Sequence, residues 1–239
     1  MSEKFGVLLH SHVSETQWEV GEITARYRKR PVEYLDSLGC LDETLLAAHC
    51  IWVEDAEIEL LARKKVGVSH CMESNLKLAS GFAPVATMLS AGIKVTFGTD
   101  SAASNNDLNI LSEMSTTAKV HKALANDPTV LDARSVLLMA TRWGAEALGL
   151  GDSCGSIAVG KAADIVVADM KKPHLTPMYD AYSHIVYSMN SADVSAVVIN
   201  GIVLMNNGRL TVADEAAIMD KAVVWGKKIR SGSPLPPSR

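Results

Sequence analysis

The sequence predicts an α/β fold: about four β/α units forming the C-terminal half of a (β/α)8 TIM barrel, followed by a small β-sandwich portion. Three observations predict it. Short apolar runs alternate with helical patterns through the first hundred residues, as in parallel sheets. Residues able to bind metal follow these runs. The chain has 239 residues, too few for a whole barrel of about 250 residues plus an accessory domain.

Four apolar runs are predicted strands, over residues 5–12, 45–51, 66–71 and 93–99. Ninety residues separate His10 from Asp100. That is room for three β/α intervals of roughly 30 residues, so the four strands are consecutive. If Asp100 follows the last strand of a barrel, His12 ends the fifth.

The segments between these strands have helical patterns. Residues 16–38 contain Pro31, which predicts a loop and a helix rather than one helix. Residues 54–65 form an amphipathic helix, acidic first and basic last, as the helix dipole favours. Residues 82–91 form a short helix that Gly92 ends.

The chain becomes helical after Asp100 and then β-rich. Two helices are predicted, over residues 108–124 and 133–148, the second capped by Asp132. A turn at Gly160-Lys161 precedes another strand, and Asn200-Gly201 predicts a hairpin between residues 194–199 and 202–205. A final helix over residues 214–229, capped by Asp214, leads to a tail expected to be disordered. The expected divisions are 1–150 for the barrel half, 151–212 for the sandwich portion and 213–239 for the helix and tail.

Composition excludes several partners. Hydrophobic residues make up 48% of the chain, and the net charge of −4 comes without any Lys/Arg-rich block. Nucleic acid and anionic membranes are therefore not expected partners. The four cysteines lack CxxC spacing, which favours buried free thiols in a reducing compartment. No run approaches the ~20 apolar residues of a membrane span, and no signal peptide is recognised, so a cytoplasmic location is expected.

Candidate metal and acid–base residues stand at or just beyond the ends of the predicted strands. His12 ends the first strand, and Glu15 follows where the strand gives way to loop, so its side chain can return beside His12. His49 ends the second strand and Asp100 follows the fourth. Because the carboxyl ends of parallel strands share one edge, we expect all four side chains to line one pocket.

Other interpretations of these residues were open. A five-ligand set would comprise His10, His12, His49, His70 and Asp100. The strand count argues against that set and leaves His10 as a deeper core residue. Asp100 could merely cap the next helix, but Asp107 is better placed to do so.

The remaining polar candidates are less specific. Ser74 and Asn75 lie in a loop predicted after the third strand, where they would order the loop or contact substrate. Lys77 is expected to be a solvated charge. His70 either supports the site or packs in the core. Three histidines have no partner at ligand spacing and are expected on the surface or in structural roles: His121, His174 and His184.

Taken as a set, these motifs resemble the amidohydrolase superfamily. The resemblance is strongest to deaminases of 5'-methylthioadenosine and S-adenosylhomocysteine, with chlorohydrolases and guanine deaminases as relatives. It is carried by six segments: His12-Val-Ser-Glu-Thr16, Ala48-His49-Cys50, Ser69-His70-x-x-x-Ser74-Asn75-Leu-Lys-Leu78, Gly98-Thr-Asp-Ser-Ala-Ala-Ser-Asn-Asn106, Gly155-Ser-Ile-x-x-Gly-Lys-x-Ala-Asp-Ile-Val166 and Val198-Ile-Asn-Gly201.

The resemblance implies a role for each residue. Such enzymes hold one divalent metal, zinc or alternatively iron, through a His-x-His pair, a later histidine and an aspartate. His12 and Asp100 match the last two. Glu15 resembles the acid that protonates the substrate ring nitrogen, and His49 the histidine that holds the attacking hydroxide. Asp100 would also accept and return a proton. The implied substrate is a purine nucleoside.

The resemblance also implies that the first half of the barrel, with its His-x-His pair, is missing. Two protein ligands are fewer than the three of a usual catalytic zinc site. The chain alone is therefore expected to bind metal weakly, to be inactive and to associate. Either a missing N-terminal half or a second chain would complete it, and the intact enzyme is expected to be a homo-oligomer.

Two other hypotheses stay open. One is a non-catalytic half-barrel that serves as an interaction module, because exposed strand edges favour pairing. The other is a different hydrolytic reaction on the same scaffold, of the chlorohydrolase or guanine deaminase type.

Overall fold

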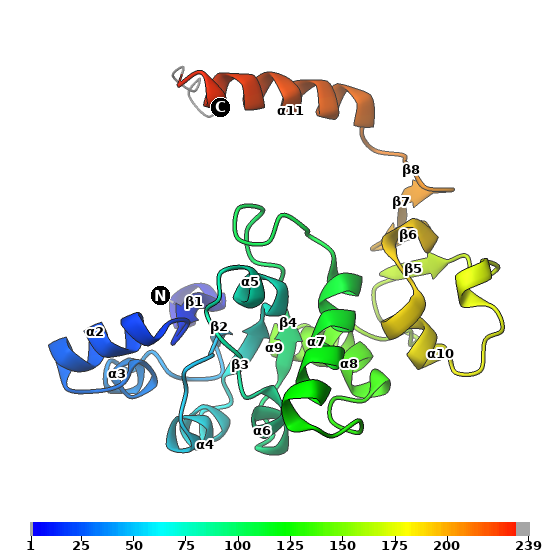
Figure 1. Ribbon diagram of the computed structural model, residues 1–239. Helices are drawn as coiled ribbons and strands as arrows, with labels where there is room; N and C mark the ends of the chain where they lie inside the picture. The colour runs from blue at the N-terminus through cyan, green and yellow to red at the C-terminus, as the bar shows by residue number, and fades with distance from the viewer. Residues whose placement is uncertain (1, 233–239) are drawn as a thin grey trace.

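The computed structural model describes residues 2–232 (Figure 1). Its first hundred residues contain a four-stranded parallel sheet. Its strands lie in chain order, so the four predicted strands are indeed consecutive neighbours. All three pairings are parallel, and Leu9 lies opposite Leu45. The strands are β1 (Leu9–Val13), β2 (Leu45–His49), β3 (Gly67–His70) and β4 (Val95–Phe97).

Helices connect these strands, and two details differ from the prediction. The first strand begins at Leu9 rather than Phe5, because Ser2–Phe5 form the short helix α1. Pro31 starts a second helix instead of only interrupting the first, since proline suits the first turn of a helix. The connecting helices are α2 (Gln17–Tyr27), α3 (Pro31–Ser37), α4 (Asp55–Arg63), α5 (Met72–Lys77) and α6 (Val85–Ser90).

Three helices follow the parallel sheet: α7 (Ile110–Ala125), α8 (Ala133–Ala140) and α9 (Arg142–Ala147). Asp132 caps α8 as predicted, accepting hydrogen bonds from the next helix turn. Asn109, not Asp107, caps α7. The helix predicted over residues 133–148 is broken at Thr141, whose φ of −129° and ψ of −95° are not helical.

The second sheet is antiparallel, with its strands in chain order. The predicted hairpin is present: Asn200 and Gly201 both have positive φ, and Ile199 pairs with Ile202. The strands are β5 (Ile165–Ala168), β6 (Val194–Ile199), β7 (Ile202–Asn206) and β8 (Arg209–Leu210). Short turns of helix lie between β5 and β6: η1 (Pro173–Leu175), α10 (Ala181–Ser183), η2 (His184–Ser188) and η3 (Ser191–Asp193).

The core lies around the parallel sheet. Every residue of β2, β3 and β4 is buried, and the helices contribute apolar side chains such as Leu61, Met88 and Met139. In β1, by contrast, four of five residues are exposed. His10 is therefore exposed rather than part of a deeper core. Strands β1 and β4 are both edge strands of the described sheet, but helices α8 and α9 pack against β4, whereas β1 contacts mainly β2.

The final helix, α11 (Glu215–Arg230), buries no residue. Asp214 caps it as predicted. Figure 1 shows it running from the β8 end back across the top of the view, above the parallel-sheet part and separate from it. Ile218 is 54% exposed and Ile229 66%. Most of the predicted tail falls in residues 233–239, outside the described residues. Within residues 2–232, no helix is both long and apolar enough to span a membrane.

The cysteines are all free in the structure, as expected. Cys50 and Cys71 are buried, whereas Cys40 and Cys154 are only partly so. The prediction that all four are buried was therefore wrong for two of them.

Candidate functional site

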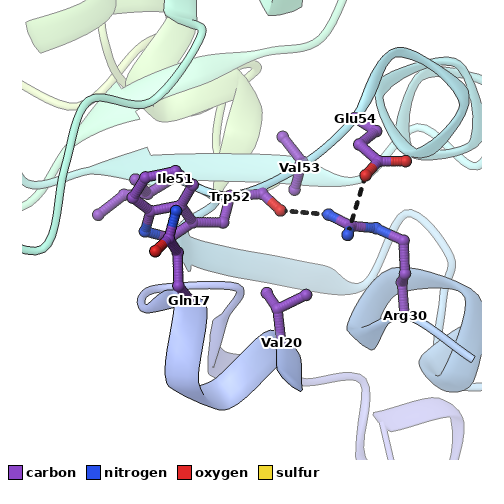
Figure 2. A pocket seen from close by; sticks show the side chains of 7 residues that line it. All are labelled: Gln17, Val20, Arg30, Ile51, Trp52, Val53 and Glu54. Carbon is purple, nitrogen blue, oxygen red and sulfur yellow. Dashed lines mark hydrogen bonds and ion pairs between the residues drawn. The ribbon is translucent and has the colours of Figure 1, made fainter. Parts of the chain in front are cut away.

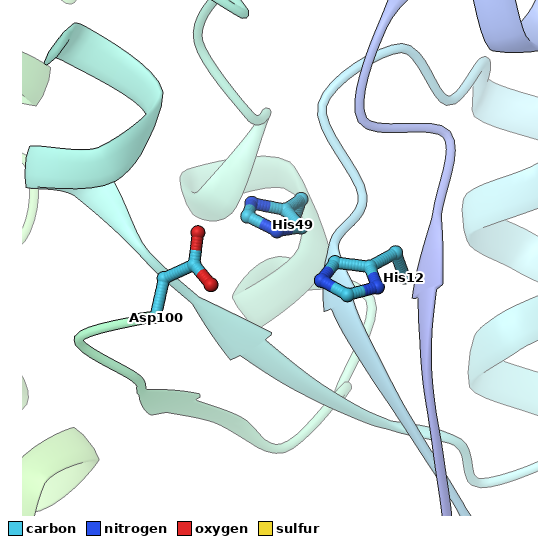
Figure 3. A group of neighbouring side chains, drawn as sticks. All are labelled: His12, His49 and Asp100. Carbon is cyan, nitrogen blue, oxygen red and sulfur yellow. The ribbon is translucent and has the colours of Figure 1, made fainter. Parts of the chain in front are cut away.

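Three side chains able to bind metal meet at the carboxyl-terminal edge of the parallel sheet (Figure 3). His12 comes from β1, His49 ends β2, and Asp100 follows β4 by three residues. One donor atom from each lies within 4.8 Å of the others. His49 is buried, Asp100 half-buried and His12 exposed, in line with the edge position of β1. The structure therefore brings together three of the four expected pocket residues at one point.

The backbone turns sharply where the strands reach this edge. Ser14, His49, Cys50 and Asp100 all have left-handed conformations, with φ between 48° and 69°. Such conformations are unfavourable for residues other than glycine and persist where surrounding contacts enforce them. Here the Cys50 amide donates to the Val13 carbonyl, which ties the turn after β2 to the end of β1.

Gly98 allows the β4 end to approach β3. A Cβ atom there would lie 2.5 Å from Ser69 Oγ and 3.0 Å from Cys71 Sγ. Because the 2.5 Å contact is closer than a real Cβ atom tolerates, any other residue at position 98 would displace the Ser69 side chain. The close approach brings Asp100 over the end of the sheet.

Glu15, the fourth pocket residue, also lies in the site. Its Oε2 is 3.8 Å from His49 Nε2, and its Oε1 accepts a hydrogen bond of 3.2 Å from Ser80 Oγ. The Glu19 carboxylate accepts hydrogen bonds from the Ser14 and Glu15 amides, at 2.8 and 2.7 Å. The loop after β1 is thus fixed so that Glu15 turns back toward His49, despite its odd spacing from His12.

Hydrogen bonds hold the Asp100 carboxylate from two sides. Ser74 Oγ donates to Oδ2 at 2.7 Å, and the Ser101 amide donates to Oδ1 at 2.8 Å. Partial burial alone would raise the pKa of Asp100, but hydrogen bonds from Ser104, Ser74 and Ser101 outweigh it, and the pKa lies below its ordinary value. Asp100 is therefore ionised at neutral pH, as a metal ligand must be.

Asn75 holds His49 from the side away from the site. Its Oδ1 lies 2.8 Å from His49 Nδ1, and Asn75 is itself buried. The His49 ring also stacks on His12, with 5.3 Å between centroids. Ring orientation is thus set by one hydrogen bond and one stacking contact.

A family model supports what the motifs predicted. The model for the amidohydrolase family matches residues 1–204. The chain belongs to the amidohydrolase family.

Relatives in this family carry specific activities in their names. The chain is 49% identical over 228 residues to a 5-methylthioadenosine/S-adenosylhomocysteine deaminase of Thermodesulfovibrio yellowstonii, covering 95% of the chain and 52% of that protein. It is 48% identical over 217 residues to a 5'-deoxyadenosine deaminase of Methanosarcina acetivorans, covering 91% and 50%. The chain spans about half the length of the curated relatives it matches.

Solved structures also match this chain over about half of their own length. An adenosine deaminase from Xanthomonas campestris with bound zinc superposes with a TM-score of 0.94 and 41% identity, over 96% of this chain and 52% of that one. A zinc-complexed atrazine chlorohydrolase from Arthrobacter aurescens gives a TM-score of 0.87 and 32% identity, over 94% and 49%.

The donor set of this amidohydrolase chain fits a zinc ion. Two imidazoles and a carboxylate are ligands that zinc accepts, and three protein ligands are usual where one position stays open for reaction. Non-haem iron(II) also uses two histidines and one carboxylate. The chemistry of the three donors therefore suits either metal that the sequence predicted.

Sequence reasoning missed the element that supports these residues. Residues 72–77, predicted as loop, form helix α5, which supplies both Ser74 and Asn75. Lys77 is exposed, as predicted, but it also donates to the Ala103 carbonyl at 2.7 Å and to Asn106. Helix α5 therefore also fastens the loop that carries Asp100.

On its other side, α5 is bonded to α7. Glu73 accepts hydrogen bonds from Ser112 and Thr116, and its amide donates to Glu113. The six residues of α5 carry no clear helical period, so the sequence offered no signal for this helix.

His70 lies behind the site and packs in the core. It is fully buried, and neither ring nitrogen has a hydrogen-bond partner among the described residues. Its ring lies 5.5 Å from that of His121, which is buried rather than on the surface. Burial lowers the pKa of His70 to about 3 and that of His121 to about 4, so both rings are neutral.

A separate pocket lies between α2 and the turn after β2 (Figure 2). It has a volume of roughly 300 Å³ and is lined by Gln17, Val20, Arg30, Ile51, Trp52, Val53 and Glu54. The Arg30 guanidinium donates a hydrogen bond to the Trp52 carbonyl at 2.6 Å and forms an ion pair with Glu54 at 3.0 Å. None of the three metal-donor residues lines this pocket.

Proposed function

We propose that this chain is the C-terminal half of a zinc-dependent deaminase acting on adenosine-type nucleosides such as 5'-methylthioadenosine and S-adenosylhomocysteine. The observation that supports this proposal most strongly is that donor atoms of His12, His49 and Asp100 lie within 4.8 Å of one another. Glu15 lies beside His49. Relatives named for deamination of such nucleosides share 45–49% identity with this chain. The zinc-bound deaminase structure supports the choice of metal.

The proposal includes a missing half, either a preceding part of the same protein or a second chain, that supplies the other four β/α units and a His-x-His pair. Two features support it: among the described residues β1 has a neighbouring strand on one edge only, and the chain spans about half of its relatives. Open edges of a sheet favour pairing. On this proposal, residues 1–150 are the barrel half, 151–212 contribute to a β-sandwich, and 213–239 form a terminal helix and tail.

Each residue has a chemical task in the proposed reaction. A zinc ion held by His12 and Asp100 would supply hydroxide at neutral pH by lowering the pKa of water. Glu15, held by Ser80, gives a proton to the ring nitrogen and so neutralises charge that attack would leave there. Asp100 accepts one proton of the attacking water and passes it to the departing ammonia, and the other proton returns to Glu15 as the product carbonyl forms. His49 orients that water.

Replacement of chloride on a triazine is the second candidate, supported by the chlorohydrolase structure. The higher identity of the adenosine-type relatives, 49% against 32%, favours deamination. Assays with both substrates separate these reactions.

The experiment joins this chain to the remaining half of the Thermodesulfovibrio relative, forming a two-part complex. In that complex, Asp100→Asn should lower kcat by about 10²–10⁴-fold with little change in KM and should lower bound zinc, because it removes a proton acceptor and a ligand together. Glu15→Gln should lower kcat by about as much while bound zinc stays constant. Steady-state kinetics beside metal analysis measures both.

His10→Ala is the matched control, since His10 is exposed on the same strand as His12 but outside the metal-donor cluster. It should leave kcat and zinc unchanged. Loss of zinc in the Glu15 variant would make Glu15 a ligand, and unchanged kcat in the Asp100 variant would remove the proposed proton transfer.

A further inference from the structure

His49 could bind metal directly, in addition to its proposed role of orienting water. We infer that in this 239-residue chain His49 is itself a metal ligand, completing with His12 and Asp100 a three-donor zinc site, and that Asn75 positions it. The inference rests on the metal requirement of the proposed function. It changes the expectation of weak metal binding, which assumed that only His12 and Asp100 could act as ligands.

The hydrogen bond to Asn75 determines which His49 nitrogen is available. A carbonyl oxygen only accepts, so the 2.8 Å contact with Asn75 Oδ1 requires the proton on His49 Nδ1. In the neutral ring, Nε2 then carries the lone pair. Metal-binding histidines usually donate their other N–H to a carboxylate or carbonyl in this way. The Asn75 contact is therefore the kind expected behind a ligand.

His49 Nε2, the nitrogen that does not contact Asn75, faces the site. His49 Nε2 lies 3.8 Å from Glu15 Oε2, so it points into the site rather than the core. Figure 3 shows the His49 ring between His12 and Asp100. Because His49 is 1% exposed and Asn75 also 1%, the pair is held in place without competition from solvent.

The separations are close to those of a zinc site. Two ligands of tetrahedral zinc, at about 2.0–2.2 Å from the metal, lie about 3.4 Å apart. The three donor atoms here lie within 4.8 Å of one another, so movements of about 1 Å would close the site. His12 can move because it is exposed on an edge strand, and Asp100 keeps free lone pairs beyond its hydrogen bonds from Ser74 and Ser101.

The test uses purified residues 1–239 without any partner. Zinc is titrated in competition with a chromogenic chelator, and cobalt(II) absorption reports the number of ligands. We expect one zinc per chain. His49→Ala should weaken zinc binding at least as much as His12→Ala, and Asn75→Leu should weaken it about 10–100-fold. Asn75→Asp keeps the acceptor and should retain wild-type affinity.

His10→Ala should bind zinc as the wild type does, and thermal unfolding of every variant checks folding. Unchanged affinity in folded His49→Ala, with lower affinity in His12→Ala and Asp100→Asn, would overturn the inference and leave the proposed function intact. Equal losses in Asn75→Asp and Asn75→Leu would show that Asn75 acts through packing and not through the His49 proton. Unchanged affinity in all three ligand variants would contradict the inference and the proposed function together.

Discussion

Two adjacent strands of one sheet show how differently the same residue type can be placed. Leu9 in β1 and Leu45 in β2 lie opposite each other in register, yet Leu9 is 42% exposed and Leu45 is 1% exposed. Strand β2 has neighbours on both edges, whereas β1 has one. Apolar pattern alone predicts that both are strands. Burial depends on what lies beside them.

Two helices, α4 and α11, differ in burial in the same way as these two strands. Helix α4 buries Ile58 at 2% and Leu61 at 0% exposure, while α11 buries none of its residues. Both are capped at the first turn and carry basic residues in the last. An amphipathic helix is stabilised mainly by packing of its apolar face. The uncovered face of α11 and the open edge of β1 are therefore the surfaces on which the proposed partner can be tested.

The largest expected difference in stability is between the two opposed leucines. Leu45→Ala should lower the free energy of unfolding by about 2–5 kcal/mol, because it removes buried methyl groups and leaves a cavity. Leu9→Ala in the same chain should change it by about 0.5 kcal/mol or less, as is usual for exposed sites. Urea unfolding followed by circular dichroism measures both.

In the two-part complex the difference should shrink, since the partner would cover Leu9. A loss of stability for Leu9→Ala in the chain alone, as large as that for Leu45→Ala, would show that β1 is already buried there.

A pH-dependent effect is expected from a buried carboxyl group near the site. Burial raises the pKa of Glu113 to about 8 from 4.5, so the folded chain holds a proton that the unfolded chain releases. This contribution is fully present below pH 4.5 and is lost as pH rises toward 8, with a slope of at most about 1.4 kcal/mol per pH unit.

Glu113→Gln should flatten that slope, because glutamine does not titrate. Unfolding free energies of both proteins between pH 5 and 8 measure the difference. Glu215→Gln on exposed α11 is the matched control and should leave the slope unchanged. Parallel curves for wild type and Glu113→Gln would mean that Glu113 is ionised in the folded chain.

The smallest effect is expected on α11. Ile229→Ser should change the free energy of unfolding of the chain alone by about 0.5 kcal/mol or less, because Ile229 is 66% exposed. Sedimentation should show weaker association with the partner half if α11 is covered in the complex. Strong destabilisation of the isolated chain would show that α11 packs on the rest of the protein in solution.

The sequence predicted most of the features that depend on short-range pattern. Strand order, the Asn200-Gly201 hairpin and the Asp132 and Asp214 caps follow from local chemistry and are present. The placement of His12 and Asp100 at one sheet edge follows from parallel topology. For the hairpin and the two caps, a few neighbouring residues determine the outcome.

What the sequence did not predict depends on contacts between distant segments. Helix α5 was predicted as a loop because its six residues are too few for a clear helical period. The binding of Lys77 to the Ala103 carbonyl joins residues 26 apart. The exposure of His10 depends on what covers an edge strand: helices α8 and α9 pack against β4, whereas β1 contacts mainly β2 among the described residues, and no local pattern reveals this.

The most direct test of the central claim is ammonia release from 5'-methylthioadenosine by three samples. These are residues 1–239 alone, the remaining half of the Thermodesulfovibrio relative alone, and their zinc-loaded equimolar mixture. We predict that only the mixture releases ammonia, and that activity appears together with a discrete complex in sedimentation. Deamination by residues 1–239 alone, or an inactive mixture that forms a discrete zinc-containing complex, would contradict it.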